Sequence, residues 1–487
     1  MGVNFRKLVN WGIILFTILF TSIVFILMIY NIFKNYVANS PTYYLLRLII
    51  AISFILLISY ILYKMTDQKI WLNRLILIVL ILIFIVIALF WVRITPRTQL
   101  SDFGNFWYRA PDVLKGQKLY AFDNDYFAKW AYQTGFMAYV MLVIKIFGYH
   151  IIAIQYLNVF YQVLTLIMVY KLSTMIFHSI KIARISVFLL LIDLDWFALN
   201  SQADNQYLGS LLFLVTFYLI LKDKYWSYIL GGFTLGFGAI IRPIGPVIIA
   251  GIIVFAVFFK IIRQHSFNIH SLWRLLIILG IYFAIFNFAG LLIKSSGLNQ
   301  YGLSNRDTSW KFVTGLNYES SGTYDQNLVN QFDLNESRLK ENTKEKTVIR
   351  QHISNLNHGD KWLELFKQKI SILWSERINA IDFTEINKKI SNTHYDKITL
   401  IGYLGSVAII LFSWIGSFAL LKSDHTDGIF LLLLPLLAFV VIQLFIEVQG
   451  RYRIEFVPIL AIISGLGVYS IFNSIKLIGG KIHAKQH

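Results

Sequence analysis

Long runs of apolar residues, separated by short polar segments, make up most of the chain. Many of these runs reach or approach the roughly 20 residues that a helix needs to cross a bilayer. The pattern predicts about twelve spans, at residues 11–30, 44–63, 71–94, 151–174, 183–199, 207–222, 226–241, 243–260, 271–293, 398–421, 428–446 and 454–472. The expected fold class is therefore an all-α polytopic membrane protein.

Composition agrees with that interpretation. Of the 487 residues, 57% are hydrophobic and 14% are charged, whereas a soluble domain carries about a quarter charged residues. Cysteine is absent, which excludes disulfides and thiolate metal sites. The formal net charge of +18 would suit a nucleic-acid partner, but the positions of the charges favour a different explanation.

The basic residues indicate the orientation of the chain in the membrane. If the N-terminus is cytoplasmic, most Lys and Arg residues of the short loops fall on the inner side. The short outer loops then hold only Lys34, Arg242, Arg451 and Arg453. This positive-inside asymmetry predicts that both termini are cytoplasmic. The first apolar run is too long for a cleaved signal peptide, and we expect it to be retained. The net charge is thus mainly a topology signal, and we expect no nucleic-acid partner.

Two segments are longer than the other connections, and both fall on the outer face. Residues 95–150 form a first outer loop whose aromatic-rich helices we expect to lie at the membrane surface. Residues 294–397 hold half of the 26 acidic residues and are long enough for a small extracytoplasmic α or α/β domain. The predicted division is an N-terminal helix pair, a transmembrane core containing the first outer loop, the outer domain, and C-terminal helices with a basic tail: 1–70, 71–293, 294–397 and 398–487.

Charged residues at the outer ends of the spans need a reason. The stretch "SDFGNFWYRA" places Asp102 just beyond the third span, and "QADNQYLGS" places Asp204 in the next outer turn. "GAIIRPIGP" contributes Arg242. "FIEVQGRYRIEF" contributes Glu447, Arg451 and Arg453 at a later outer crossing. Ion pairing between helices is one explanation for these charges.

A catalytic site is the other explanation. Asp102 is placed to accept a proton from a hydroxyl nucleophile. Asp204 would orient that group or join Asp102 in binding a divalent cation through carboxylate oxygens. The arginines match the geometry of a phosphate. Together they predict a site at the outer membrane surface where a hydroxyl attacks and a lipid phosphate leaves.

These stretches resemble the GT-C superfamily of polyprenyl-phosphate-sugar-dependent glycosyltransferases. The chain is most similar to the bacterial relatives of protein O-mannosyltransferase and lipid A aminoarabinose transferase. The resemblance rests on "SDFGNFWYRAPDVLKGQKLY", "QADNQYLGSLLF", "IRPIGP", "TGLNYESSGTYD" and "EVQGRYRIEFVPIL", taken in this order. It departs from some relatives at Asp102, which is followed by Phe103 rather than by a second acid, so the second acid would be Asp204 or Asp112. Two spans also precede the usual first one.

The resemblance implies the roles of individual residues. Asp102 and Asp204 take the catalytic acidic positions, and both would be the ligands if a divalent cation binds. Arg242 is the expected phosphate contact, and the late segment adds Glu447, Arg451, Tyr452 and Arg453 as substrate-binding residues.

The resemblance also implies the reaction, an inverting sugar transfer from a polyprenyl-phosphate donor to an envelope glycopolymer or protein on the outer face. A flippase for lipid-linked sugars and an O-antigen-type polymerase or ligase are the alternatives. Transporters gather polar groups near the bilayer midplane, whereas the charges of this chain gather at one face, which favours an enzyme.

Overall fold

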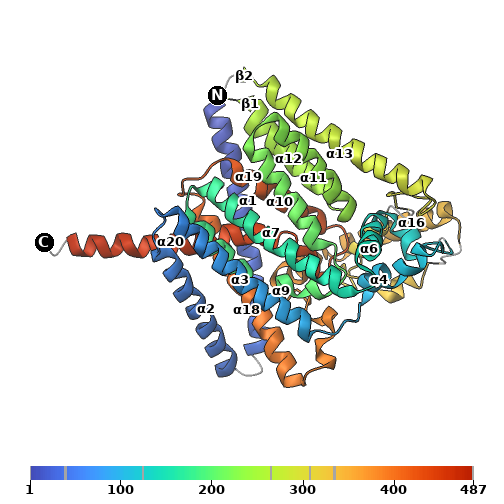
Figure 1. Ribbon diagram of the computed structural model, residues 1–487, viewed down its shortest axis with the longest axis horizontal. Helices are drawn as coiled ribbons and strands as arrows, with labels where there is room; N and C mark the ends of the chain where they lie inside the picture. The colour runs from blue at the N-terminus through green and yellow to red at the C-terminus, as the bar shows by residue number, and fades with distance from the viewer. Residues whose placement is uncertain are drawn as a thin grey trace.

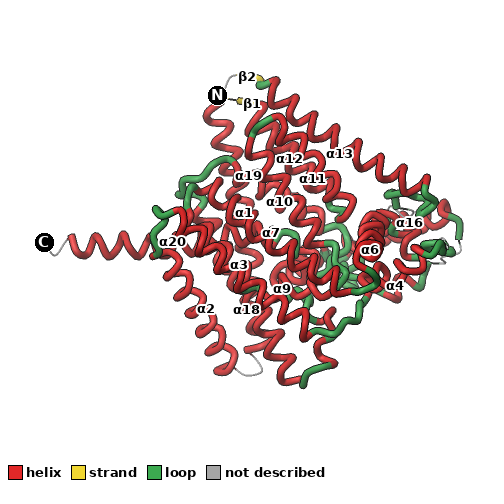
Figure 2. Tube along the Cα trace, viewed as in Figure 1, coloured by secondary structure: helices red, strands yellow, loops and turns green. Residues whose placement is uncertain are grey.

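The computed structural model describes residues 2–37, 41–122, 125–263, 266–305, 309–332 and 336–484, and helices make up most of it (Figures 1 and 2). The α-helices in chain order are α1 (Gly2–Ile32), α2 (Pro41–Lys64), α3 (Ile70–Ile94), α4 (Ser101–Leu114), α5 (Tyr126–Lys129), α6 (Thr134–Phe147), α7 (Ile151–Phe177), α8 (Ile180–Leu191), α9 (Leu194–Phe197), α10 (Gln206–Lys222), α11 (Tyr225–Ile241), α12 (Gly245–Phe255), α13 (Ile269–Ser295), α14 (Trp310–Gly315), α15 (Gln326–Val329), α16 (Arg338–His358), α17 (Trp362–Ile370), α18 (Asn392–Ala419), α19 (Gly428–Gln443) and α20 (Val457–Ala484).

Short 3-10 and π-helical segments, loops and one strand pair complete the described chain. Three of the short helical segments matter below: η3 (Ala198–Ser201), η5 (Ser371–Ser375) and η8 (Gly450–Arg453). The strands β1 (Ile262–Arg263) and β2 (Ser266–Phe267) form an antiparallel pair between α12 and α13.

Seven helices within the described ranges are long and apolar enough to cross a membrane, namely those at Arg6–Tyr36, Thr42–Lys64, Ile70–Ile94, Ile151–Phe177, Ile269–Ser295, Asn392–Ala419 and Val457–Lys476. Five more apolar helical stretches are shorter, at Ala131–Phe147, Gln206–Lys222, Tyr225–Ile241, Gly245–Ile261 and Gly428–Gln443. The chain is therefore a multi-pass membrane protein.

One predicted span is not a continuous helix. Residues 183–199 were expected to cross the membrane, but α8 ends at Leu191 and the chain continues as the short α9 and η3. The break coincides with Asp193 and Asp195, which are almost completely buried. Gly402 and Gly405 of α18 leave room for them, because a Cβ on either glycine would lie within 3 Å of an atom of these aspartates. The apolar pattern concealed this break.

Close helix packing in the core depends on small residues. A Cβ on Gly416 of α18 would lie 2.1 Å from the carbonyl oxygen of Ile463, and one on Gly467 of α20 would lie 2.1 Å from that of Phe412. A Cβ on Gly251 of α12 would lie 2.5 Å from the backbone nitrogen of Pro435 in α19. Such residues let helix backbones approach in a membrane, where packing replaces the hydrophobic effect.

The N-terminal helix packs against the C-terminal part of the chain. Phe25 of α1 stacks on Trp414 of α18 with ring centroids 4.1 Å apart. Thr21 and Ser417 share a hydrogen bond at 2.9 Å. Asn31 donates to Ser371 in η5 at 2.9 Å. The helix that precedes the expected core thus contacts both α18 and the segment 294–397.

The segments expected to lie outside the membrane gather at one end of the molecule. Figure 1 shows α4, α6 and α16 together at this end, opposite the C-terminal end of α20. The described part of 294–397, which omits 306–308 and 333–335, is helical and contains no strand. This segment contains the helices α16 and α17.

Candidate functional site

A cavity of about 800 Å³ lies among the loops of this end. Its lining comes from the start of α4, residues 126–133, the turn between α11 and α12, the segment containing α14, and the stretch from the end of α19 to η8. It brings together most of the predicted site residues, namely Asp102, Arg242, Glu447, Arg451 and Tyr452. These residues are far apart in the chain and meet only through the fold.

Asp102 and Arg451 form an ion pair in the wall of the cavity. Asp102 lies in the first turn of α4, where the helix dipole favours a carboxylate. Arg451 donates from Nη2 to Oδ2 of Asp102 at 2.5 Å and from Nε to the side-chain oxygen of Gln449 at 2.9 Å. The arginine side chain is 6% exposed and that of Asp102 is 31% exposed. The aspartate is therefore open to a ligand from one side while the arginine holds it from the other.

Three cations surround the ring of Tyr452. The guanidinium of Arg242 lies 5.4 Å from the ring centroid, that of Arg451 lies 5.9 Å away, and Nζ of Lys311 also lies 5.9 Å away. The electron-rich ring face attracts cations at such distances. All three cations line the cavity, so the ring collects positive charge where a ligand would enter.

Each of these cations has its own carboxylate partner. Arg242 pairs with Glu455, Lys311 pairs with Glu447 at 2.7 Å, and Arg451 pairs with Asp102. Burial alone would raise the pKa of Glu447, but the charge of Lys311 together with hydrogen bonds from Lys311, Gln449 and Tyr452 holds that pKa below its usual value. Tyr452 donates to Glu447 at 3.1 Å. The cluster is thus compact, and an anion that binds a cation must replace or share a carboxylate.

Lys311 was not among the residues predicted from the sequence. It belongs to α14, inside the expected outer domain, and no motif or spacing distinguishes it from other surface lysines. The fold brings it in because the backbone N–H of Glu447 donates to the carbonyl of Lys311 at 2.9 Å. The outer segment therefore supplies a charged group to the cavity.

Lys369 fixes this junction from behind. It is 1% exposed, and its Nζ donates to the carbonyl of Gly315 at 2.6 Å and to that of Ile446 at 2.8 Å. Burial lowers the pKa of Lys369 to about 7. Gly315 permits the contact, since a Cβ there would lie 2.3 Å from the carbonyl carbon of Ile446. The short α14 and the stretch before Glu447 are in this way held together.

Asp204, predicted as catalytic, lies behind the cavity rather than in its lining. It is 1% exposed, and its Oδ1 accepts from the backbone N–H of Gln206 at 3.2 Å. Its Oδ2 is buried and has no hydrogen-bond partner in the described chain. Burial raises the pKa of Asp204 to about 7, against the opposing influence of Arg242 and Arg451. Its position suits electrostatic support of the arginines rather than contact with a ligand.

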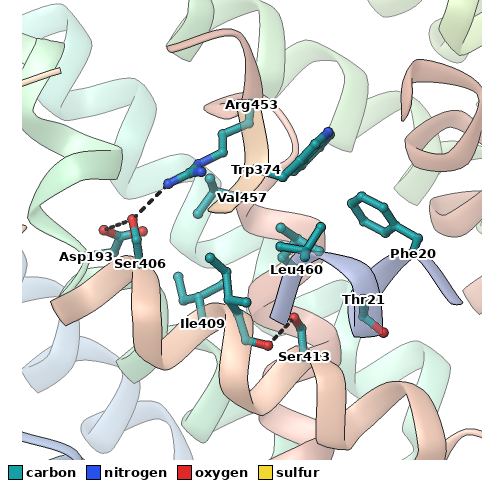
Figure 3. A pocket seen from close by; sticks show the side chains of 12 residues that line it. Phe20, Thr21, Asp193, Trp374, Ser406, Ile409, Ser413, Arg453, Val457 and Leu460 are labelled. Carbon is teal, nitrogen blue, oxygen red and sulfur yellow. Dashed lines mark hydrogen bonds between the residues drawn. The ribbon is translucent and has the colours of Figure 1, made fainter. Parts of the chain in front are cut away.

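Arg453, predicted to bind substrate, also lies outside the cavity. It is 2% exposed and donates to the carbonyl of Leu373 at 3.1 Å and to Ser406 at 3.4 Å. Figure 3 shows it reaching towards Ser406 and Asp193 in a small pocket between helices. Because η8 carries both Arg451 and Arg453, the buried arginine anchors the turn that presents the other one to the cavity.

The carboxylates of this region are not arranged to bind a divalent cation. Such ions take about six or more oxygen ligands. Asp102 is bonded to Arg451, Asp204 is buried outside the cavity lining, and the described residues contain no group of three or more His, Cys, Asp or Glu side chains placed to hold a metal. We therefore derive no step through a metal ion.

Comparison with known proteins bears on the fold. No protein-family model and no curated protein matches the chain. Among solved structures, the chain is similar to the crystal structure of the Archaeoglobus fulgidus oligosaccharyltransferase in its apo form. The TM-score is 0.50 at 13% identity, over 86% of this chain and 53% of that one. The chain thus spans about half the length of the archaeal protein. The similarity shows the fold alone: this chain has an all-α membrane fold similar to that of the archaeal protein.

Proposed function

We propose that this protein is a glycosyltransferase that moves a sugar from a polyprenyl-phosphate donor to a hydroxyl of a cell-envelope acceptor, on the outer face of the membrane. The observation that carries the proposal is the pairing of Asp102 with Arg451 in the wall of the large cavity. A carboxylate and a phosphate-binding group lie side by side there, as a displacement at a glycosyl phosphate requires. The GT-C-like fold and the resemblance to bacterial polyprenyl-phosphate-sugar transferases support the same function.

The cavity has the two kinds of surface that a lipid phosphate needs. Phe439 and Ile244 provide an apolar part beside the ends of α19 and α12. The cations around Tyr452 provide a polar part. Guanidinium groups bind phosphate in a bidentate way. The phosphate would therefore lie at Arg242 and Arg451, with Lys311 as an additional contact, and the prenyl chain would extend along the apolar side.

Binding of the phosphate would also prepare the base. Arg451 holds Asp102 in the described state, so a phosphate that takes up hydrogen bonds from Arg451 loosens its grip on the aspartate. The freed carboxylate can then accept the proton of the acceptor hydroxyl. This exchange explains why a general base and a phosphate contact share one ion pair.

The transfer is a single displacement with inversion. The acceptor oxygen attacks the anomeric carbon and forms the new glycosidic bond while its proton passes to Asp102. The bond between the anomeric carbon and the phosphate oxygen breaks, and its electron pair stays on the phosphate. Arg242, Arg451 and Lys311 stabilise the charge that develops there, so the leaving group needs no proton.

The aromatic lining fits the sugars. Trp130, Tyr132, Trp310 and Tyr324 border the cavity, and pockets for small ligands combine such aromatic surfaces with a few polar groups. Two of the four, Trp310 and Tyr324, belong to the outer segment, which we propose covers the site and contributes to acceptor choice.

The test is consumption of donor by purified protein in detergent, where no gradient exists. Polyprenyl-phosphate sugars are incubated with the protein and an envelope extract, and release of polyprenyl phosphate is followed by mass spectrometry. We expect release by the wild type and release about 10²–10⁴-fold slower by Asp102→Asn. A protein that binds the donor without ever releasing the lipid phosphate would contradict the proposal and favour a transporter.

A further inference from the structure

Gln443 is an isolated polar residue at the edge of the cavity. It is the last residue of α19, "GIFLLLLPLLAFVVIQ", and the only polar side chain of that helix. It is 5% exposed and lines the cavity. One turn earlier, Phe439 also lines the cavity and stacks on Phe456 with ring centroids 4.5 Å apart. The amide therefore lies where the apolar part of the cavity meets the charged stretch that begins at Glu447.

The amide of Gln443 has no partner among the residues that the structure describes. Its Oε1 is buried without a hydrogen bond, and its nitrogen donates to none of those residues either. Other buried glutamines differ: Gln206 donates to Glu455 at 3.0 Å, and Gln155 donates to the carbonyl of Ser201 at 2.8 Å. Buried polar groups are nearly always bonded, and an exception calls for an explanation.

The chemistry of the amide restricts what can bind it. A glutamine side chain offers an acceptor and a donor side by side, whichever way the group is turned. Phosphate oxygens can accept a hydrogen bond from the amide N–H, but they cannot donate one to the amide oxygen, because an ionised phosphate carries no hydrogen. A sugar hydroxyl donates and accepts, and two neighbouring hydroxyls can satisfy both ends of the amide together. The unpartnered amide thus fits a sugar better than the phosphate or the prenyl chain.

We infer that Gln443 binds hydroxyl groups of the donor sugar and helps to determine which sugar is transferred. This inference rests on the proposed function, since it assigns the residue of the same site that recognises the donor sugar. A donor whose prenyl chain follows Phe439 and whose phosphate lies at the arginines has its sugar next to the phosphate, within the wall that Gln443 completes. Loss of a hydroxyl partner would leave the buried amide unpaired, which is how such sites discriminate between similar substrates.

The experiment compares the binding of a bare prenyl phosphate with that of one glycosylated form, in the wild-type protein and in Gln443→Leu. The probes are a short-chain prenyl phosphate and its glucosyl, galactosyl, mannosyl and arabinosyl derivatives, with binding measured by calorimetry in detergent. The glycosylated lipid that binds the wild type more tightly than the bare phosphate is carried forward. We expect Gln443→Leu to weaken binding of that lipid about tenfold or more, and to leave binding of the bare prenyl phosphate within twofold.

Thermal stability separates a ligand contact from a structural role. Because the amide bonds to nothing in the described chain, Gln443→Leu should keep or raise the unfolding temperature. The matched control is Gln155→Leu, the same change at a bonded glutamine outside the cavity lining, which should lower the unfolding temperature and leave the ratio of the two affinities unchanged. Gln443→Met, which is unbranched and of similar length but lacks the amide, provides a second variant and should lose the same preference for the sugar.

The outcomes are distinguishable. If Gln443→Leu and Gln443→Met weaken binding of both ligands equally, or weaken neither, the assignment of Gln443 is overturned and the proposed function still stands. Failure of the wild-type protein to bind either the prenyl phosphate or any glycosylated form would instead overturn the proposed function, and this inference with it.

Discussion

Arg451 and Asp102, 349 positions apart in the chain, meet in the wall of the cavity, where Nη2 of the arginine donates to Oδ2 of the aspartate at 2.5 Å. The pair joins the first outer loop to the turn before α20. The guanidinium of Arg451 is suited to binding a phosphate, and the carboxylate of Asp102 is suited to accepting a proton. The pair therefore links donor binding to the chemical step. Its replacement therefore affects binding and chemistry in different ways.

The first prediction concerns the base. Asp102→Asn should lower kcat about 10²–10⁴-fold, the usual contribution of a general base. The amide cannot accept the proton, and the change also removes a negative charge beside Arg451. The KM for the donor should therefore stay the same or fall. Initial rates at several donor concentrations check both parts; a rate within a few-fold of wild type would rule out Asp102 as the base.

The second prediction concerns the phosphate. Arg242→Ala and Arg451→Ala should each raise the KM for the donor at least tenfold, and much more than that for the acceptor, because both side chains line the cavity beside Tyr452. Arg→Lys at either position should restore binding only in part, since an ammonium group cannot bind in a bidentate way.

Arg109 provides the control for the arginine variants. It lies on α4, as Asp102 does, but it pairs with Asp125 and does not line the cavity. Arg109→Ala should leave the donor KM unchanged. If neither cavity arginine alters donor binding beyond this control, the phosphate site lies elsewhere.

Some residues of this site could be predicted from the sequence and others could not, depending on whether a charge interrupts an apolar span. Asp102, Arg242 and Arg451 stood out because charges are rare at the outer ends of apolar spans, and the fold does bring them together. Arg453 shares that signal, yet two positions along η8 the chain has turned and its side chain faces Leu373 and Ser406 instead. Charge at a span end thus identifies the region of the site, but not the direction of each side chain.

Residues supplied by the outer segment were harder to predict. Lys311 lies between Trp310 and Phe312 in a stretch with no recognisable motif, and only tertiary contacts place it beside Glu447. The break after Leu191 was missed although Asp193 and Asp195 interrupt the run there, because the residues on either side of them are apolar enough to continue the pattern of a span. Local periodicity records which face is buried, and it contains no information on which distant segment buries it.

The third prediction concerns pH. Burial raises the pKa of Asp204 to about 7, so this carboxyl is protonated below neutrality and ionised above it. Ionisation adds negative charge beside Arg242 and Arg451 and opposes a bound phosphate. The affinity for a glycosyl phosphodiester should fall roughly threefold to tenfold between pH 6 and pH 8, as expected for charges that interact at an effective dielectric constant of about 20.

Asp204→Asn tests that assignment, because it resembles the protonated form at every pH. Its affinity for the donor should stay at the low-pH value. Stability should follow the same group: the folded pKa lies above the unfolded value, so the wild type loses stability relative to the Asn variant as pH rises from about 4 to 7. A variant with the same pH dependence of binding as the wild type would exclude Asp204 as the titrating group.

The last prediction concerns the side of the membrane. Lys311 belongs to the outer segment and lines the cavity. The side of the membrane on which residues 294–397 lie therefore determines the side on which the reaction takes place. Asn327 and Asn357 are exposed in this segment, and the chain has no native cysteine to give background labelling. Single cysteines at either position should react with an impermeant thiol reagent in intact cells. Gln68, exposed between α2 and α3 on the expected inner side, is the matched control, and Gln68→Cys should react only after lysis. The opposite pattern would place the cavity on the cytoplasmic face, where an acceptor in the envelope cannot reach Asp102.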